Sequence, residues 1–136
     1  MKKYVNFSFF YAILGLCGGV FYREFTKLYD YVDLRTQLAF LHVHLLVLGM
    51  VMFLILAIFE KLLHISQSKK IKAFLITYNL GVLWTVTVMI VRGVMQVVGF
   101  DGGAAVSGIA GLGHIILTVG IVLLFLILKE RIKAQQ

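Results

Sequence analysis

The sequence predicts an all-α integral membrane protein, a bundle of four transmembrane helices that forms a single domain over residues 1–136. Three observations support this prediction. Of the 136 residues, 61% are hydrophobic and 14% are charged, and the mean hydropathy is +0.98, well above that of a soluble domain. Proline is absent. The apolar residues gather into four runs, each close to the ~20 residues that cross a ~30 Å hydrocarbon core.

The four expected helices cover about residues 4–22, 36–59, 73–98 and 105–128. The first run lacks the small-residue cleavage site of a signal peptide and is interpreted as a helix. The segment from Arg23 to Arg35 is mixed in charge and rich in aromatic residues, so we expect a loop with a short helix in the membrane interface. A basic, polar loop follows at residues 60–72, and glycines around Asp101 predict a tight turn before the last helix.

The positive charges predict the orientation of the bundle. Nine lysines and arginines flank the spans on the side that holds both termini, three lie on the opposite side, and Arg92 lies within the third span. The positive-inside rule then places both termini in the cytoplasm. This topology accounts for the formal charge of +7 with the lipid bilayer as the partner and without nucleic acid. The single cysteine, Cys17, excludes an intramolecular disulfide.

Four ionisable side chains lie inside the apolar runs: His42, His44, Arg92 and His114. Such side chains are costly in a bilayer unless they have a partner, a cavity or a ligand. At a rise of 1.5 Å per residue, the two histidines of the second span lie ~8 to 12 Å below its outer end. Arg92 lies ~9 Å and His114 ~14 Å below the outer ends of their spans. This shared depth favours a common cofactor site or polar pocket near the outer surface.

A haem fits this set better than a bare metal ion, because it offers an apolar macrocycle, an iron that takes axial histidines, and propionates that need a cation such as Arg92. Residues two apart on a helix are separated by ~200°, so His42 and His44 cannot both ligate one iron. Either one is structural or the helix serves a cofactor on each side, and His114 is the alternative ligand. Copper or zinc is the main competitor, with Met50 and Met52 as soft ligands for copper.

The runs HVHLLVLGM (residues 42–50) and RGVMQ (residues 92–96) are similar to those of a small bacterial four-helix membrane family of unknown function. This resemblance covers nearly the whole chain and implies the bacterial cytoplasmic (inner) membrane as the location. The His-x-His pair also distantly resembles one four-helix arc of the catalytic subunit of haem–copper oxidases, which has three such arcs.

The oxidase resemblance implies that His42 and His44, on the second helix of an arc, ligate two different haems, and that Arg92 holds haem propionates. A chain with one arc would need a homotrimer to rebuild the twelve-helix ring, with His42 of one subunit and His44 of the next on either side of each haem. A histidine pair for copper and a cross-linked tyrosine are missing from the pattern, which argues against oxygen reduction.

We therefore expect a b-type haem protein with bis-histidine ligation, used for electron transfer or for haem or redox sensing rather than for catalysis. A redox partner or a quinone is the expected source of electrons. One alternative is a small oligomeric transporter or channel lined by the polar stripes of the third and fourth helices. A second is a gas-handling haem protein for NO or O2, which requires a five-coordinate iron. A monomer with haem between the second and fourth helices and His114 as a ligand is a third arrangement.

Overall fold

The computed structural model of the chain describes residues 1–32, 34–100 and 103–136. The first span is α1 (Lys2–Leu28). The second runs without a break through η1 (Gln37–Phe40), α2 (Leu41–His44), η2 (Leu45–Val51) and α3 (Met52–Leu63). A short turn, η3 (Ile65–Gln67), leads into α4 (Ile71–Val97), and α5 (Gly103–Lys133) ends the fold.

The prediction of four membrane-spanning helices is confirmed, because the described residues contain four helices that are long and apolar enough to cross a bilayer. Most helix ends lie within a few residues of the expected positions. The largest difference is in α1, which continues to Leu28 and so includes the residues from Arg23 onward that were predicted to form a loop. Asp101, at the centre of the predicted turn, lies outside the described residues.

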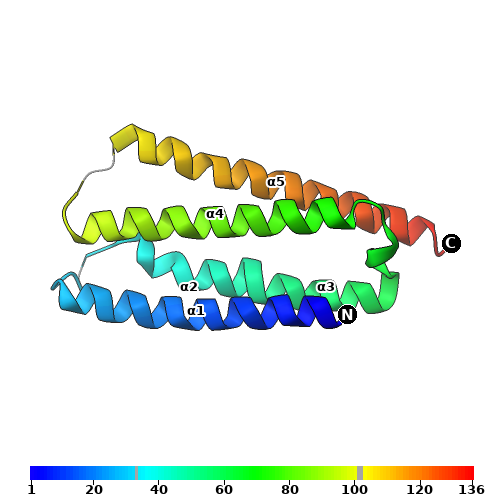
Figure 1. The fold of residues 1–136 in the computed structure, drawn as a ribbon, viewed down its shortest axis with the longest axis horizontal. Coiled ribbons are helices and arrows are strands. Elements are labelled where there is room, and N and C mark those ends of the chain that lie inside the picture. Colours follow the sequence, from blue (N-terminus) through cyan, green and yellow to red (C-terminus); the bar gives the residue numbers. More distant parts are fainter. Residues whose placement is uncertain (33, 101–102) are drawn as a thin grey trace.

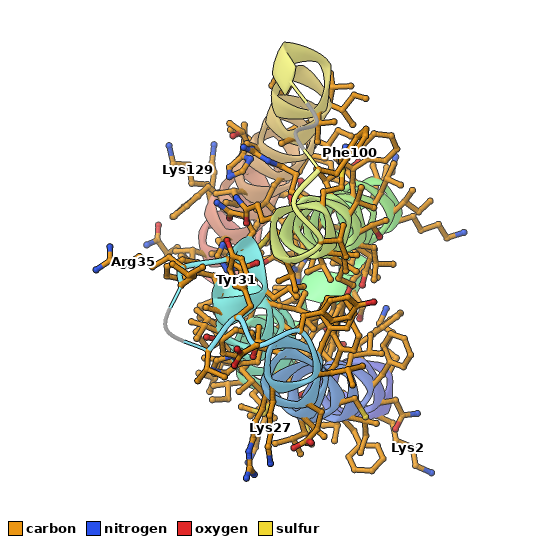
Figure 2. The ribbon with its side chains drawn as sticks, turned by 90° about the vertical axis from the view of Figure 1, so that its left-hand side faces the viewer. Lys2, Lys27, Tyr31, Arg35, Phe100 and Lys129 are labelled. Atoms are coloured by element: carbon orange, nitrogen blue, oxygen red, sulfur yellow. The ribbon has the colours of Figure 1, made fainter. Side chains whose placement is uncertain are left out.

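The helices form two hairpins that lie side by side (Figure 1). In the first, α1 packs along α2, η2 and α3, and in the second, α4 packs along α5. The hairpins meet mainly where α4 contacts η1, α2 and η2. We call the end of the bundle that holds both termini the termini end, and the opposite end the distal end. At the distal end α5 lies beyond α4, far from α1 (Figure 2).

Polar contacts fix α5 to the rest of the protein at the termini end. The Arg131 Nε donates a hydrogen bond to the Leu63 carbonyl at 3.0 Å, and the Gln135 Nε2 donates to the Leu62 carbonyl at 2.8 Å. Lys70, the residue before α4, forms an ion pair at 2.6 Å with Glu130 of α5. The last helix is therefore tied to the α3–α4 connection at one end, and its distal half rests on α4.

The second span is irregular in its middle, where η2 (Leu45–Val51) is π-helical. Two backbone carbonyls of this segment accept side-chain hydrogen bonds from neighbouring helices: Leu48 from the Tyr78 hydroxyl at 3.0 Å and Met50 from the Ser8 hydroxyl at 2.9 Å. Because lipid offers no hydrogen-bond partners, irregular backbone inside a membrane has to be satisfied by protein in this way. Such π segments are rare and frequent at functional sites.

Close packing of α4 on α5 depends on Gly81. A Cβ atom at this position would lie 2.8 Å from the Leu117 backbone nitrogen and 2.9 Å from its Cα. We expect Gly81→Ala to destabilise the folded protein by roughly 1–3 kcal/mol, because the backbones of the two helices have to separate. The matched control is Gly111→Ala, where an added Cβ meets nothing within 4 Å.

Thermal unfolding in detergent measures both variants. The control should be unchanged or slightly more stable, because alanine is favoured over glycine in a helix by roughly 0.5–1 kcal/mol. Equal melting temperatures for Gly81→Ala and Gly111→Ala would contradict the described α4–α5 contact.

Candidate functional site

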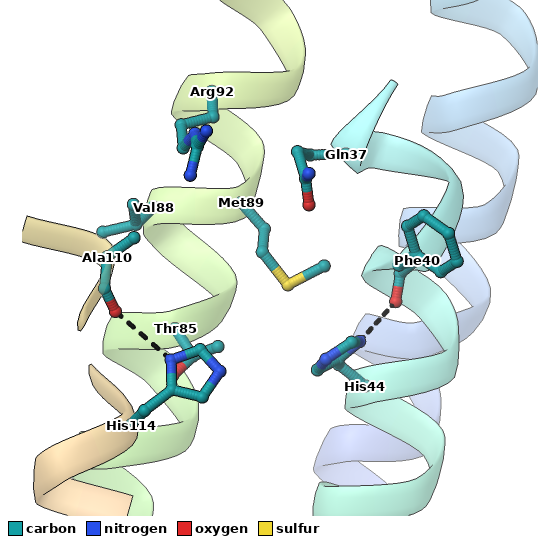
Figure 3. A pocket seen from close by; sticks show the side chains of 9 residues that line it. All are labelled: Gln37, Phe40, His44, Thr85, Val88, Met89, Arg92, Ala110 and His114. Carbon is teal, nitrogen blue, oxygen red and sulfur yellow. Dashed lines mark hydrogen bonds between the residues drawn. The ribbon is translucent and has the colours of Figure 1, made fainter. Parts of the chain in front are cut away.

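A cavity of about 230 Å³ lies in the distal half of the bundle, between the second span on one side and α4 with α5 on the other. Figure 3 shows its side chains, which project from both sides toward the gap. The cavity is lined by Gln37, Phe40, His44, Thr85, Val88, Met89, Arg92, Ala110 and His114. Three of the four predicted site residues, His44, Arg92 and His114, are thus brought together.

The start of the second span is anchored on α4, and this positions His44 relative to Arg92. The Thr36 hydroxyl donates to the Gly93 carbonyl at 3.0 Å, and the Gln37 backbone N–H donates to the Gln96 Oε1 at 2.8 Å. Gly93 allows the approach, because a Cβ there would lie 2.7 Å from the Leu38 backbone nitrogen. On α4 the anchor uses Gly93, which follows Arg92, and Gln96, one helix turn further on, so it fixes which face of the second span turns toward Arg92.

A second close contact places His114 beside Thr85. A Cβ at Gly113 would lie 2.5 Å from the Thr85 Oγ1, so α5 sits directly on α4 at this point. The Trp84 Nε1 donates to the Ile109 carbonyl at 3.0 Å and holds the same stretch of α5. His114 is exposed beyond this contact, so the cavity is open on the side of α5.

The two cavity histidines make the same hydrogen bond. The Nδ1 of His44 lies 2.9 Å from the Phe40 carbonyl, and the Nδ1 of His114 lies 3.3 Å from the Ala110 carbonyl, each four residues earlier on the same helix (Figure 3). A carbonyl oxygen can only accept, so Nδ1 carries the proton in both rings. In the neutral imidazole, Nε2 is then an unprotonated nitrogen that can ligate a metal. Such carbonyl bonds are typical of metal-ligating histidines.

His42 lies on a different face of the second span, as the helical rotation predicts. Its Cβ lies 3.7 Å from the place that a Cβ would take at Gly19 of α1, and it is outside the lining of the cavity. The His42 Nδ1 is buried and, within the described part of the chain, has no hydrogen-bond partner. His42 therefore lacks the carbonyl bond that sets the state of the other two rings.

Of the remaining lining, Gln37 and Arg92 form a polar distal edge, Thr85 adds a hydroxyl group beside His114, and the other residues, Phe40, Val88, Met89 and Ala110, are apolar. Gln37 and the half-buried Arg92 lie nearest the distal end in Figure 3, and the thioether of Met89 lies in the gap between the two spans. Met50 and Met52, the predicted soft ligands, pack against the hydrophobic core instead. The described residues contain no cluster of three or more His, Cys, Asp or Glu side chains that could hold a metal ion.

Six of the nine lining residues were not predicted as site residues, and three of these, Thr85, Val88 and Met89, lie on the face of α4 that carries Arg92. The sequence could have predicted these residues, because the i, i+3, i+4, i+7 spacing of one helix face is followed by Thr85, Val88, Met89 and Arg92. Following this helix face from Arg92 toward the start of the helix reaches Val88 and Met89 after one turn and Thr85 after two.

The model of a family described as proteins of unknown function, DUF2871, matches residues 1–131. The chain therefore belongs to this family, which agrees with the resemblance to a small membrane family of unknown function. The search of curated proteins gives no match, and neither does the search of solved structures.

Proposed function

We propose that this member of the DUF2871 family binds one haem b in the distal cavity, with His44 and His114 as the axial ligands. The proposal is supported by the hydrogen bond that both rings share. Each Nδ1 is bonded to a backbone carbonyl, which leaves both Nε2 atoms free to ligate iron from opposite sides of the gap. Bound haem supplies one-electron chemistry, and two axial histidines leave no open position on its iron. Electron transfer or redox sensing is then favoured over catalysis.

The other residues that line the cavity suit a haem. Phe40, Val88 and Ala110 give apolar walls, and the Arg92 guanidinium at the distal end is the cation that would hold the propionates. The cavity is smaller than the ~300–1,000 Å³ of typical ligand pockets. Binding therefore requires Met89 to turn aside, which its unbranched side chain permits. The macrocycle would extend toward the open side, where it would cover the exposed His114.

This arrangement uses two histidines of one chain, so a single subunit is sufficient for the haem. His42 on the other face stays a candidate for contact with a neighbouring subunit, as in the homotrimer that the oxidase resemblance implies. The positive-inside rule places the termini end in the cytoplasm and the cavity toward the outer surface of a bacterial inner membrane. There, a quinone in the bilayer or a redox partner at the surface would exchange electrons with the haem.

A second candidate function is binding of Cu(I), favoured by the position of Met89 between the two spans in Figure 3. Two imidazoles and a thioether form a donor set that suits Cu(I). A copper ion would fit the cavity without enlarging it, and Arg92 would not be one of its ligands.

Optical spectra of the purified protein test the first proposal. We expect a Soret band, and we expect His44→Ala and His114→Ala each to lose most of it, because one axial ligand is missing in either variant. His42→Ala should keep the haem, and His64→Ala, in the exposed connection before α4, is the matched control. Carbon monoxide should change the reduced wild-type spectrum little, since both axial positions are filled. A colourless protein, or full haem in both cavity variants, would defeat the proposal.

Met89→Leu separates the two candidate functions, because it keeps the volume of the side chain and removes the sulfur. If the cavity holds haem, this variant should bind haem as the wild type does. If it holds Cu(I), titration with Cu(I) against a competing chelator should show an affinity loss of roughly tenfold or more, since a soft ligand is removed. Met95→Leu, outside the lining, is the control.

A further inference from the structure

The last turns of α1 carry a second pocket, at the distal end of the bundle and apart from the cavity, which we call the distal basic pocket. Its volume is about 400 Å³. It is lined by Tyr22, Arg23, Thr26, Lys27 and Val32. The expected helix ended near residue 22, and the continuation of α1 to Leu28 places Arg23 and Lys27 one turn apart on the same helix face. The pocket therefore holds two cations.

The end of α1 folds back on itself and closes one side of this pocket. The Tyr31 backbone N–H donates to the Thr26 carbonyl at 2.8 Å. The Asp30 backbone N–H donates to the Lys27 carbonyl at 3.2 Å, with Asp30 in the left-handed region at φ 54°. These are the two hydrogen bonds of a Schellman turn, which ends a helix and reverses the chain. The turn returns Val32 to the side of α1, so backbone hydrogen bonds set the shape of the pocket.

Little negative charge balances the two cations within the described residues. The Arg23 Nε lies 3.6 Å from the Glu24 carboxylate, and these side chains are 80% and 59% exposed. Such an exposed pair contributes roughly 0–1 kcal/mol. Lys27 forms no ion pair within the part of the chain that the structure describes. Two like charges one turn apart destabilise a helix by roughly 0.2–0.5 kcal/mol, and an anion between them would remove this repulsion.

The surface of α1 next to the pocket is apolar and uncovered. Val20 and Leu16 lie three and seven residues before Arg23, which is the spacing of one helix face, and they are 64% and 63% exposed. Figure 2 shows the Lys27 side chain pointing away from the other helices. The two cations therefore stand at the end of an apolar stripe, the position at which a bilayer presents its headgroups.

Neither membrane orientation nor the helix dipole accounts for both cations. Three lysines and arginines flank the spans at the distal end, and two of them lie in this pocket. The positive-inside rule gives no reason to place them there, because it concentrates positive charge at the termini end. A cation in the last turn complements the helix dipole, which applies to Lys27. Arg23 lies more than one turn from the end of α1, where this effect has faded.

We propose that the distal basic pocket binds the phosphate group of an anionic phospholipid in the leaflet at the distal end, with an acyl chain along the apolar stripe. The planar guanidinium of Arg23 donates two hydrogen bonds to the phosphate oxygens, and the Lys27 ammonium adds a second positive charge. The Tyr22 hydroxyl is a further donor in the lining. A zwitterionic lipid suits the pocket less, because its ammonium group would approach two cations.

Quenching of tryptophan fluorescence by brominated lipids measures lipid binding at this face alone. Trp84 is the single tryptophan of the chain, so Trp84→Phe with Leu16→Trp places one indole on the apolar stripe. In mixed bilayers, dibrominated phosphatidylglycerol should occupy this face roughly fivefold or more in preference to dibrominated phosphatidylcholine, equivalent to ~1 kcal/mol. Equal quenching by the two lipids would overturn the proposal.

Charge variants in the same background test the residues. Arg23→Gln together with Lys27→Gln should abolish the preference, because the phosphate loses both cations. Glu24→Gln should raise it, since the competing carboxylate is removed. The matched control is Arg35→Gln, an exposed cation at the same end that is outside the pocket lining, and it should keep the preference. A double variant with the preference of its parent, or a control that loses it, contradicts the assignment.

Replacing chloride by inorganic phosphate at equal ionic strength separates a lipid headgroup from the free ion. A preference that persists in phosphate supports the lipid. A preference lost in phosphate alone shows that the pocket takes the free ion and overturns the lipid assignment.

Wild-type protein gives a readout that does not depend on the tryptophan variants. Photoactivatable phosphatidylglycerol should label residues 22–32, and a labelling pattern without this segment also overturns the proposal. Haem is not involved in either measurement, so a protein without a Soret band leaves this inference intact.

Discussion

A histidine inside a hydrocarbon core has to find its hydrogen-bond partner within the protein, because lipid offers none. His44 and His114 meet this constraint in the same way, each through the carbonyl one turn earlier on its own helix. This bond fixes the ring so that its second nitrogen faces the cavity unprotonated. The contacts of Thr36 with Gly93 and of Gly113 with Thr85 then bring two such rings to one space.

The two halves of the bundle differ in a way that suits this arrangement. At the termini end, Arg131 and Gln135 tie α5 to α3 of the first hairpin, the Lys70–Glu130 pair ties it to the start of α4, and buried tyrosines fill the interior. At the distal end α5 rests on α4, the cavity is open on one side, and His114 is exposed. The π-helical segment lies between these halves. A closed, hydrogen-bonded half thus supports an open half in which a cofactor would complete the packing.

The sequence was sufficient to predict the four spans and three of the cavity residues, because apolar run length and the rarity of ionisable residues in lipid are strong local signals. The helical rotation also predicted that His42 and His44 face different ways. Which of them faces the cavity depends on the docking of Thr36 onto Gly93, residues 57 apart in sequence, and that contact has no local signal. The π-helical segment was missed for the same reason, since its partners Tyr78 and Ser8 lie on other spans.

The proposed ligation depends on which ring nitrogen of His44 and of His114 carries the proton. Nitrogen NMR measures this directly. The measurement uses ¹⁵N-histidine-labelled, ligand-free protein in lipid bilayers, with His42→Gln and His64→Gln introduced so that His44 and His114 alone contribute signals. At neutral pH both rings should show a protonated Nδ1 and an unprotonated Nε2. A protonated Nε2 on either ring would contradict the described hydrogen bonds and remove that histidine as an iron ligand.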